Sequence, residues 1–198
     1  MLDLDPAAQE VIRLVGGVTD EQLTHPTPST DVSVAALLDH LLGLSLAFTW
    51  AARKSGGDGP GSSAPPPPAS ADNLDPQWRT LLPRRLGELV EAWRQPEAWT
   101  GMTTAGGVTL PAEVMGVVAL DELVLHGWDL ARATRQSFHC DPASTEAVLA
   151  FTAESAKPEQ AAGREGLFGP VVPVPADAPP LDRALGFAGR DPGWTAPS

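Results

Sequence analysis

The strongest constraint on the fold is a set of apolar stripes that repeat with the period of an α-helix. Residues 34–53 and residues 111–134 each carry an apolar side chain at every third or fourth position. The first stripe consists of Val34, Leu37, Leu38, Leu41, Leu44 and Phe48. A stripe of this kind forms one helix face that is buried against other helices. Further helices are predicted over residues 6–15, 76–94 and 143–156, so the sequence predicts an all-α bundle.

Residues that favour helix starts predict where these helices begin. Asp5 is expected to cap the first helix, either Thr30 or Asp31 the second, and Asp141 the last, because their side chains can accept hydrogen bonds from free backbone amides. Pro83 lies inside the third stripe and is expected to kink or divide that helix, since proline lacks the amide hydrogen that an interior turn needs.

Three segments lack helical stripes. Residues 56–75 are rich in Gly, Ser and Pro, which predicts a long crossover loop between bundle helices or a lid over a site. Residues 99–110 predict a hairpin-like turn around two adjacent glycines. Residues 158–198 predict an extended C-terminal tail with one short helix at 181–187. We expect one domain over residues 1–198, because a chain of this length fills a single core.

The charge of the chain argues against two classes of partner. It has 25 acidic and 13 basic residues and a net charge of −12. Nucleic acids and anionic membranes are bound mainly through Lys and Arg, so we expect neither as a partner. No stretch is expected to approach the roughly 18 to 20 apolar residues of a membrane span. A single cysteine, Cys140, and the absence of a signal-like N-terminus predict a cytoplasmic protein.

Three polar residues in the apolar stripes are candidates for a metal site. Glu122 and His126 are four positions apart, so a helix would place both side chains on one face. His40 lies in the other long stripe, where packing does not require a histidine. Two imidazoles and one carboxylate could hold a divalent metal and leave positions open for water or substrate.

Other interpretations of these residues stay open. A Glu and His four apart often occur by chance, and either histidine could instead bond a backbone carbonyl or Asp39, Asp121 or Asp129. Asp129 shares the face of His126 and could orient its ring, or it could be a solvated helix end paired with Arg132.

The remaining candidates are weaker. Trp128, close to His126, could line a pocket, whereas His25 and His139 lie in turn-like stretches and are expected at the surface. Cys140 follows His139 but has no other feature of a nucleophile, so we expect it to be unreactive. The Gly-rich residues 56–61 lack the Lys-Ser or Lys-Thr of a phosphate-binding loop.

Four segments carry a resemblance to a known family: residues 26–28, 38–43, 122–134 and 189–194. Together they resemble the DinB-like metal-binding superfamily, in particular the actinobacterial branch that includes the N-terminal domain of mycothiol-dependent maleylpyruvate isomerase. The run His-Gly-Trp-Asp-Leu-Ala-Arg, which starts at His126, is the most specific part. The resemblance implies a four-helix bundle with one long crossover loop and a metal held by His40, Glu122 and His126.

The chain departs from this branch in two ways. The isomerases carry a second C-terminal domain that completes the active site, and the tail here is too short to supply it. Ser29 and Val32 stand where the branch often has aromatic or Cys residues. Both departures weaken the transfer of the isomerase activity itself, and neither touches the three expected ligands.

The function that the resemblance implies is a metal-dependent thiol transferase or isomerase. Its cofactor would be a divalent metal, foremost zinc, with nickel and iron as alternatives. Its partners would be mycothiol or a similar small thiol and an electrophilic substrate; no residue stands out as a general base. A metal-dependent hydrolase, a non-catalytic metal- or ligand-binding bundle, and a bundle in which the triad is only structural remain alternatives. The sequence leaves open whether the protein forms a homodimer.

Overall fold

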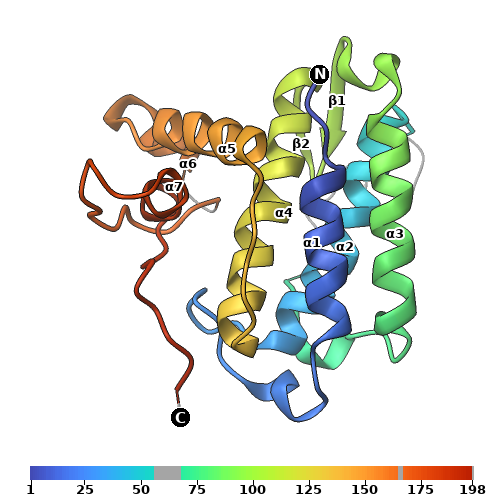
Figure 1. Ribbon diagram of the computed structural model, residues 1–198. Coiled ribbons are helices and arrows are strands. Elements are labelled where there is room, and N and C mark those ends of the chain that lie inside the picture. Colours follow the sequence, from blue (N-terminus) through green and yellow to red (C-terminus); the bar gives the residue numbers. More distant parts are fainter. Residues whose placement is uncertain (56–67, 165–166, 198) are drawn as a thin grey trace.

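In the computed structural model, which describes residues 1–55, 68–164 and 167–197, four long helices lie side by side (Figure 1). They are α1 (Asp5–Gly16), α2 (Val34–Ala52), α3 (Trp78–Trp93) and α4 (Ala112–Thr134). Their apolar stripes face one another and form a core of leucine, valine, alanine and tryptophan side chains. The predicted all-α four-helix bundle is confirmed.

Shorter elements connect and flank the bundle. The strands β1 (Met102–Ala105) and β2 (Val108–Pro111) form an antiparallel hairpin. Gly106 and Gly107 turn this hairpin with φ angles of 57° and 82°, which residues with a side chain rarely adopt, as predicted for this segment. The other elements are η1 (Glu21–Thr24), η2 (Ala71–Asn73), η3 (Pro96–Trp99), α5 (Pro142–Ser155), η4 (Pro158–Gln160), α6 (Ala161–Arg164) and α7 (Pro180–Phe187).

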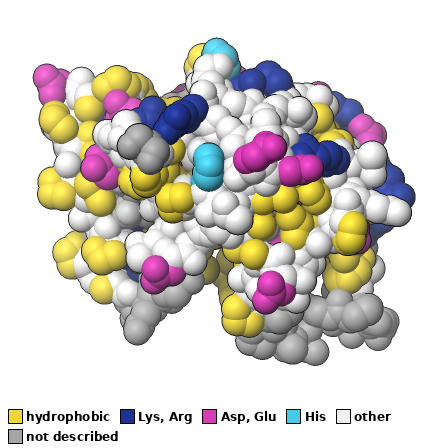
Figure 2. Space-filling model, turned by 90° about the horizontal axis from the view of Figure 1, so that it is seen from below, with side chains coloured by type: hydrophobic (Ala, Val, Ile, Leu, Met, Phe, Trp, Pro, Cys, Tyr) yellow, Lys and Arg dark blue, Asp and Glu magenta, His cyan; other side chains and the backbone are white. Residues whose placement is uncertain are grey.

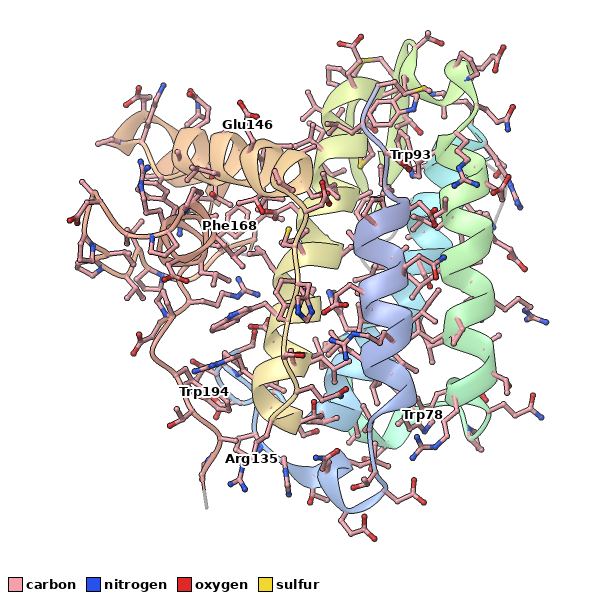
Figure 3. The ribbon with its side chains drawn as sticks, viewed as in Figure 1. Trp78, Trp93, Arg135, Glu146, Phe168 and Trp194 are labelled. Carbon is pink, nitrogen blue, oxygen red and sulfur yellow. The ribbon has the colours of Figure 1, made fainter. Side chains whose placement is uncertain are left out.

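Two tryptophans close the core at the end of the bundle that carries the hairpin. The rings of Trp93, labelled in Figure 3, and Trp99 meet edge to face with centroids 5.0 Å apart. The indole of Trp93 donates to the carbonyl of Phe48, at 3.1 Å, so its polar atom is satisfied inside the core. Gly116 of α4 leaves room for this pair, because a Cβ there would lie only 2.5 Å from the Trp99 ring.

Two of the three predicted helix caps are corrected by the structure. Asp5 is the first residue of α1 and does not cap it. Ser33, rather than Thr30 or Asp31, caps α2 by accepting a hydrogen bond from the amide of Ala36. A turn closed by the amide of Thr27 and the carbonyl of Val32 occupies the preceding residues and delays the helix. The predicted cap of α5 by Asp141 is confirmed.

Helix α3 runs unbroken through Pro83, so of the two predicted effects, a kink or a division, the division is wrong. Proline removes one backbone hydrogen bond from the helix interior. Leu82 and Leu86, on either side of it, are fully buried in the core, and this packing holds the helix together where local propensity would interrupt it.

Among the described residues, one helix is long and apolar enough to cross a membrane by length and composition, and it is α2. The expectation that no stretch approaches such a length is therefore wrong. Of the apolar window in α2, 67% is buried inside the structure. The side chains that made α2 so apolar are those that pack against α3 and α4.

The predicted loop over residues 56–75 lies partly outside the described residues, at 56–67. The remainder returns along α2, where the amide of Ser70 donates to the carboxylate of Asp39 at 3.1 Å. The segment Ala71–Asn73, next to this contact, forms η2 against the same helix. This end of the loop thus lies beside the residue that precedes His40.

Part of the C-terminal tail is buried in the core and does not lie only on the surface. Helix α7 lies against α5 on one side of α4 (Figure 1), and Ala184, Leu185 and Ala188 are fully buried in the common core. From there the chain runs along α4, past Trp194, labelled in Figure 3. Seen from below, a hollow separates the α5–α7 side of the molecule from the bundle along one edge (Figure 2).

Candidate metal centre

The structure brings His40, Glu122 and His126 together. His40 comes from α2, and the other two residues lie one turn apart on the neighbouring α4. The Nε2 atoms of both histidines face the same carboxylate oxygen, Oε2 of Glu122, at 3.4 Å for His40 and 3.0 Å for His126. The imidazole rings meet edge to face with centroids 4.7 Å apart. Ligand atoms of all three residues lie within 4.8 Å of one another.

This triad is partly open to solvent. The exposed fraction of the side chain is 40% for His40, 25% for Glu122 and 15% for His126. His126 and Glu122 are therefore held in the protein wall, while His40 forms the more accessible side. A small molecule could approach the three donor atoms from the side of His40.

The triad is strongly polarised. Burial alone would raise the pKa of Glu122, but hydrogen bonds from His126 and His40 outweigh it and hold the pKa below the usual range. Burial alone would lower the pKa of His126. Its bonds to Asp129 and Glu122 prevail and raise the pKa of His126 to about 9. In the metal-free protein, a carboxylate thus faces an imidazolium at neutral pH.

Asp129 lies behind His126, as its position on the shared helix face suggested. Its carboxylate is completely buried, and Oδ2 lies 3.1 Å from Nδ1 of His126. The hydroxyl of Ser29 donates to the same oxygen at 3.1 Å. Arg132, the alternative partner of Asp129, instead donates from Nε to the carbonyl of Trp194 at 2.9 Å.

Sequence reasoning missed two residues of this network: Ser29, which was noted only as a departure from the family, and Arg190. Its Nη2 donates to Oδ2 of Asp129 at 3.1 Å, and its side chain is only 11% exposed. Arg190 lies in the segment 189–194, which had been noted only for its resemblance to the family. That likeness was the one signal in the sequence that could have pointed to it.

Two neighbours on α4 differ in their relation to the site. Trp128 is buried in the hydrophobic core, with the guanidinium of Arg132 5.8 Å from its ring centroid, and its lining of a pocket stays a prediction. Asp121 is almost fully buried, and its Oδ1 has no hydrogen-bond partner among the described residues. Burial first, and then the charge of Glu122, raise the pKa of Asp121 well above its ordinary value.

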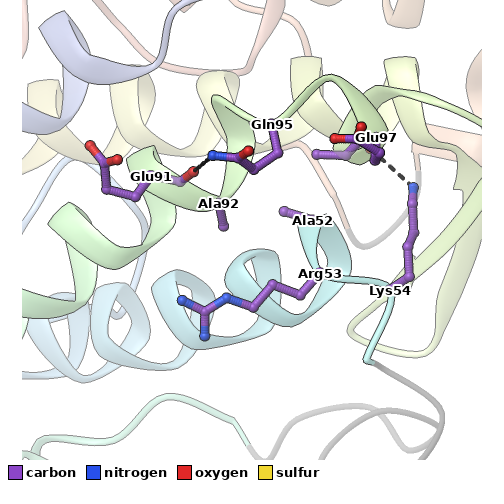
Figure 4. A pocket seen from close by; sticks show the side chains of 8 residues that line it. Ala52, Arg53, Lys54, Glu91, Ala92, Gln95 and Glu97 are labelled. Atoms are coloured by element: carbon purple, nitrogen blue, oxygen red, sulfur yellow. Dashed lines mark hydrogen bonds between the residues drawn. The ribbon is translucent and has the colours of Figure 1, made fainter.

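Two cavities occur elsewhere on the described surface. One, of about 430 Å³, lies between the ends of α2 and α3 (Figure 4), where Lys54 donates to the carbonyl of Ala98 at 3.0 Å. The other, of about 440 Å³, includes Glu10, His139 and Cys140. Burial, first of all, raises the pKa of Cys140, which agrees with the expectation of an unreactive thiol. Neither cavity contains a residue of the triad.

Comparison with known proteins identifies the family. The family model described as "Mycothiol maleylpyruvate isomerase N-terminal domain" matches residues 4–131, about two thirds of the chain. The chain belongs to this family. The matched segment contains His40, Glu122, His126 and Asp129, whereas Arg190 lies beyond it.

The chain is also similar to individual known proteins. Two uncharacterised proteins of Mycobacterium tuberculosis, MT0763 (strain CDC 1551 / Oshkosh) and Rv0738 (strain H37Rv), are each 27% identical to it over 180 residues. The matches cover 89% of this chain and 90% of each relative. Among solved structures, the crystal structure of the mycothiol-dependent maleylpyruvate isomerase matches with a TM-score of 0.63 and 20% identity. That match covers 82% of this chain and 70% of the other, and it supports the fold.

Proposed function

We propose that His40, Glu122 and His126 bind one divalent metal ion, and that the protein uses it with a low-molecular-weight thiol such as mycothiol. The reaction would be a thiol transfer or an isomerisation of an electrophilic small molecule. The observation that carries the proposal is the convergence of two imidazole Nε2 atoms on one carboxylate oxygen, on adjacent helices of a rigid bundle. Family membership supports the thiol.

The donor set fits a metal ion. In a tetrahedral zinc site, ligand atoms about 2.0–2.1 Å from the metal lie about 3.3 Å from one another. The two distances to Oε2 of Glu122, 3.0 and 3.4 Å, are close to that separation. Imidazole and carboxylate ligands suit zinc first, with nickel and iron(II) as alternatives. The contact from Nδ1 of His126 to Asp129 directs Nε2 of His126 toward the site.

A bound divalent metal would act as a Lewis acid that lowers the pKa of a coordinating thiol and so supplies the nucleophile at neutral pH. The protein's own residues would hold this position and limit access to it. His126 and Glu122 form the inner wall, and the half-exposed His40 forms the open side through which thiol and electrophile would enter. Because all three residues of the triad would be metal ligands, none of them is free to act as a separate general base.

The chemistry of the chain also bears on its setting. The net charge of −12 supports small molecules, rather than nucleic acid, as partners. A single half-buried cysteine is compatible with the reducing cytoplasm in which a thiol cofactor would stay reduced. Since α7 joins the core of the bundle, we infer that residues 1–198 form one domain.

Cobalt substitution tests the thiol directly. The protein would be loaded with Co²⁺ and titrated with mycothiol, while its visible and near-ultraviolet spectrum is recorded. We expect a new sulfur-to-cobalt absorption that saturates with thiol and is absent in Glu122→Gln. Cobalt binding with no thiol-dependent change would contradict the thiol proposal and favour a hydrolase or a non-catalytic metal-binding bundle.

A further inference from the structure

Arg190 reaches the triad from the far end of the chain. It follows α7, and Gly189 before it adopts a φ of 83° at a close approach to Gly169. The side chain enters the protein and meets both oxygens of Asp129, with Nη2 at 3.1 Å from Oδ2 and Nε at 3.5 Å from Oδ1. This two-pronged contact is the geometry with which a guanidinium recognises a carboxylate.

The buried carboxylate of Asp129 requires such a partner. It has no solvent exposure, and an ionised carboxylate without a counter-charge is very costly in the protein interior. The three groups that donate to it come from three parts of the chain: Ser29 before α2, His126 on α4, and Arg190 in the tail. Arg190 is the only one of them that carries a permanent positive charge.

No other ionised acid is in direct contact with Arg190 among the described residues. Its remaining polar contacts are with the carbonyl of Ala188 at 3.1 Å and the hydroxyl of Ser29 at 3.5 Å. Asp121 and Glu122 act on it only through their charge, and the raised pKa of Asp121 favours its neutral form. The guanidinium is therefore committed to Asp129.

An ionised Asp129 fixes the state of the neighbouring imidazole. A carboxylate can only accept, so Nδ1 of His126 must carry the hydrogen that it shares with Asp129. The lone pair of a neutral His126 is then on Nε2, the atom that faces Glu122 and His40. Without the two contacts from Arg190, the Asp129 carboxylate would be free to turn away from Nδ1 of His126, and this preference for one tautomer would be lost.

We propose that Arg190 is a positioning residue of the metal centre: by pairing with Asp129 it holds His126 with Nε2 directed at the triad. The C-terminal segment thereby completes a site that α2 and α4 provide only in part. Its test by zinc affinity rests on the proposed metal binding, whereas its test by the tautomer of the His126 ring needs no metal.

Two substitutions of Arg190 test the proposal, with Arg132 as the matched control. Arg190→Gln removes the charge, and Arg190→Lys keeps the charge but loses the two-pronged contact. Arg132→Gln removes an arginine that anchors the same tail, through the carbonyl of Trp194, without touching Asp129. Zinc affinity would be measured by competition with a chromophoric chelator, and circular dichroism would verify that each variant is folded.

We expect Arg190→Gln to weaken zinc binding by about 10- to 100-fold, as is typical when a group that orients a metal-binding histidine is removed. Arg190→Lys should recover part of this loss, and Arg132→Gln should stay within about twofold of the wild type. Equal zinc affinity in Arg190→Gln and wild type would overturn the proposal. An equal loss in Arg132→Gln would also overturn it, because it would trace the effect to general docking of the tail.

Nitrogen NMR of the His126 ring gives the second readout in the metal-free protein at pH 10, above the pKa of His126. We expect the wild-type ring to carry its hydrogen on Nδ1, and the Arg190→Gln ring to show a mixture of tautomers. An unchanged ring signature in Arg190→Gln would contradict the proposal. If the wild type binds no zinc but the tautomer changes as expected, the proposed function fails and the positioning role stands.

Discussion

Nη2 of Arg190 lies 3.1 Å from Oδ2 of Asp129, although the two residues are 61 positions apart in the chain. The same carboxylate oxygen lies 3.1 Å from Nδ1 of His126. One buried acid therefore links the C-terminal segment to a histidine of the triad. The centre depends on the tail as well as on the two helices that carry the expected ligands.

Asp129→Asn should destabilise the protein by about 3 kcal/mol, because it leaves the guanidinium of Arg190 buried without its counter-charge. Ser29→Ala, which removes a neutral donor to the same carboxylate, should cost only about 1 kcal/mol. Urea unfolding followed by circular dichroism gives both values. Equal and small losses for the two variants would show that the ion pair contributes little to stability.

The stability of the metal-free protein should fall as the pH rises from 6.5 to 9. The pKa of His126 is raised from 6.5 to about 9 in the folded state, so the folded state holds a proton that the unfolded state has released over this range. The stabilisation is complete below pH 6.5 and is lost as the pH passes 9. Its size is at most about 3 kcal/mol.

Urea unfolding of chelator-treated protein at several pH values measures this slope. His126→Gln, which has no titrating ring, serves as the control and should lack the decrease. Zinc affinity should change in the opposite direction, because a proton on His126 competes with the metal. A metal-free wild type whose free energy of unfolding is constant between pH 6.5 and 9 would refute the assigned ion pairs of His126.

Gly116→Ala should destabilise the bundle by about 1–3 kcal/mol. A Cβ at this position would meet the Trp99 ring at 2.5 Å and the Trp93 ring at 3.0 Å, and the rigid aromatic pair has little room to move. Gly87→Ala in α3 is the matched control, since its Cβ would have no neighbour within 4 Å. We expect it to stabilise the protein by up to about 1 kcal/mol through helix propensity. Thermal unfolding of both variants tests the Trp93–Trp99 packing.

At pH 8, iodoacetamide should modify Cys140 in the folded protein at least about tenfold more slowly than it modifies the same thiol in urea-unfolded protein. Burial in the first place, together with the nearby charges of Asp141 and Glu10, raises the pKa of this thiol and disfavours the reactive thiolate. Mass spectrometry of timed samples gives both rates. Modification at equal rates in the folded and unfolded states would reopen Cys140 as a nucleophile.

The sequence predicted the parts of this structure that depend on local periodicity. The stripe in residues 111–134 placed Glu122 and His126 on one face of a helix, and helix geometry alone then brought the two side chains together. His40 required more, because only the packing of α2 against α4 brings it to Glu122. The resemblance to a known family supplied that pairing in advance.

Features set by competition or by tertiary contact escaped prediction. Thr30, Asp31 and Ser33 could all have capped α2, and the turn between Thr27 and Val32 decided in favour of Ser33. Arg190 has no periodic pattern around it, and its role follows from the docking of the tail on α4. A lone arginine in a Gly- and Pro-rich segment gives no signal of its own for such a contact.

Elemental analysis tests the central claim most directly. The protein would be purified without chelator or affinity tag, and its metal content compared with that of Glu122→Gln and His126→Ala. The account predicts about one divalent metal ion per wild-type chain and loss of that metal in both variants. A wild-type protein that contains no metal, and takes up none after incubation with zinc, would contradict the account and leave the triad as a hydrogen-bonded structural feature of the bundle.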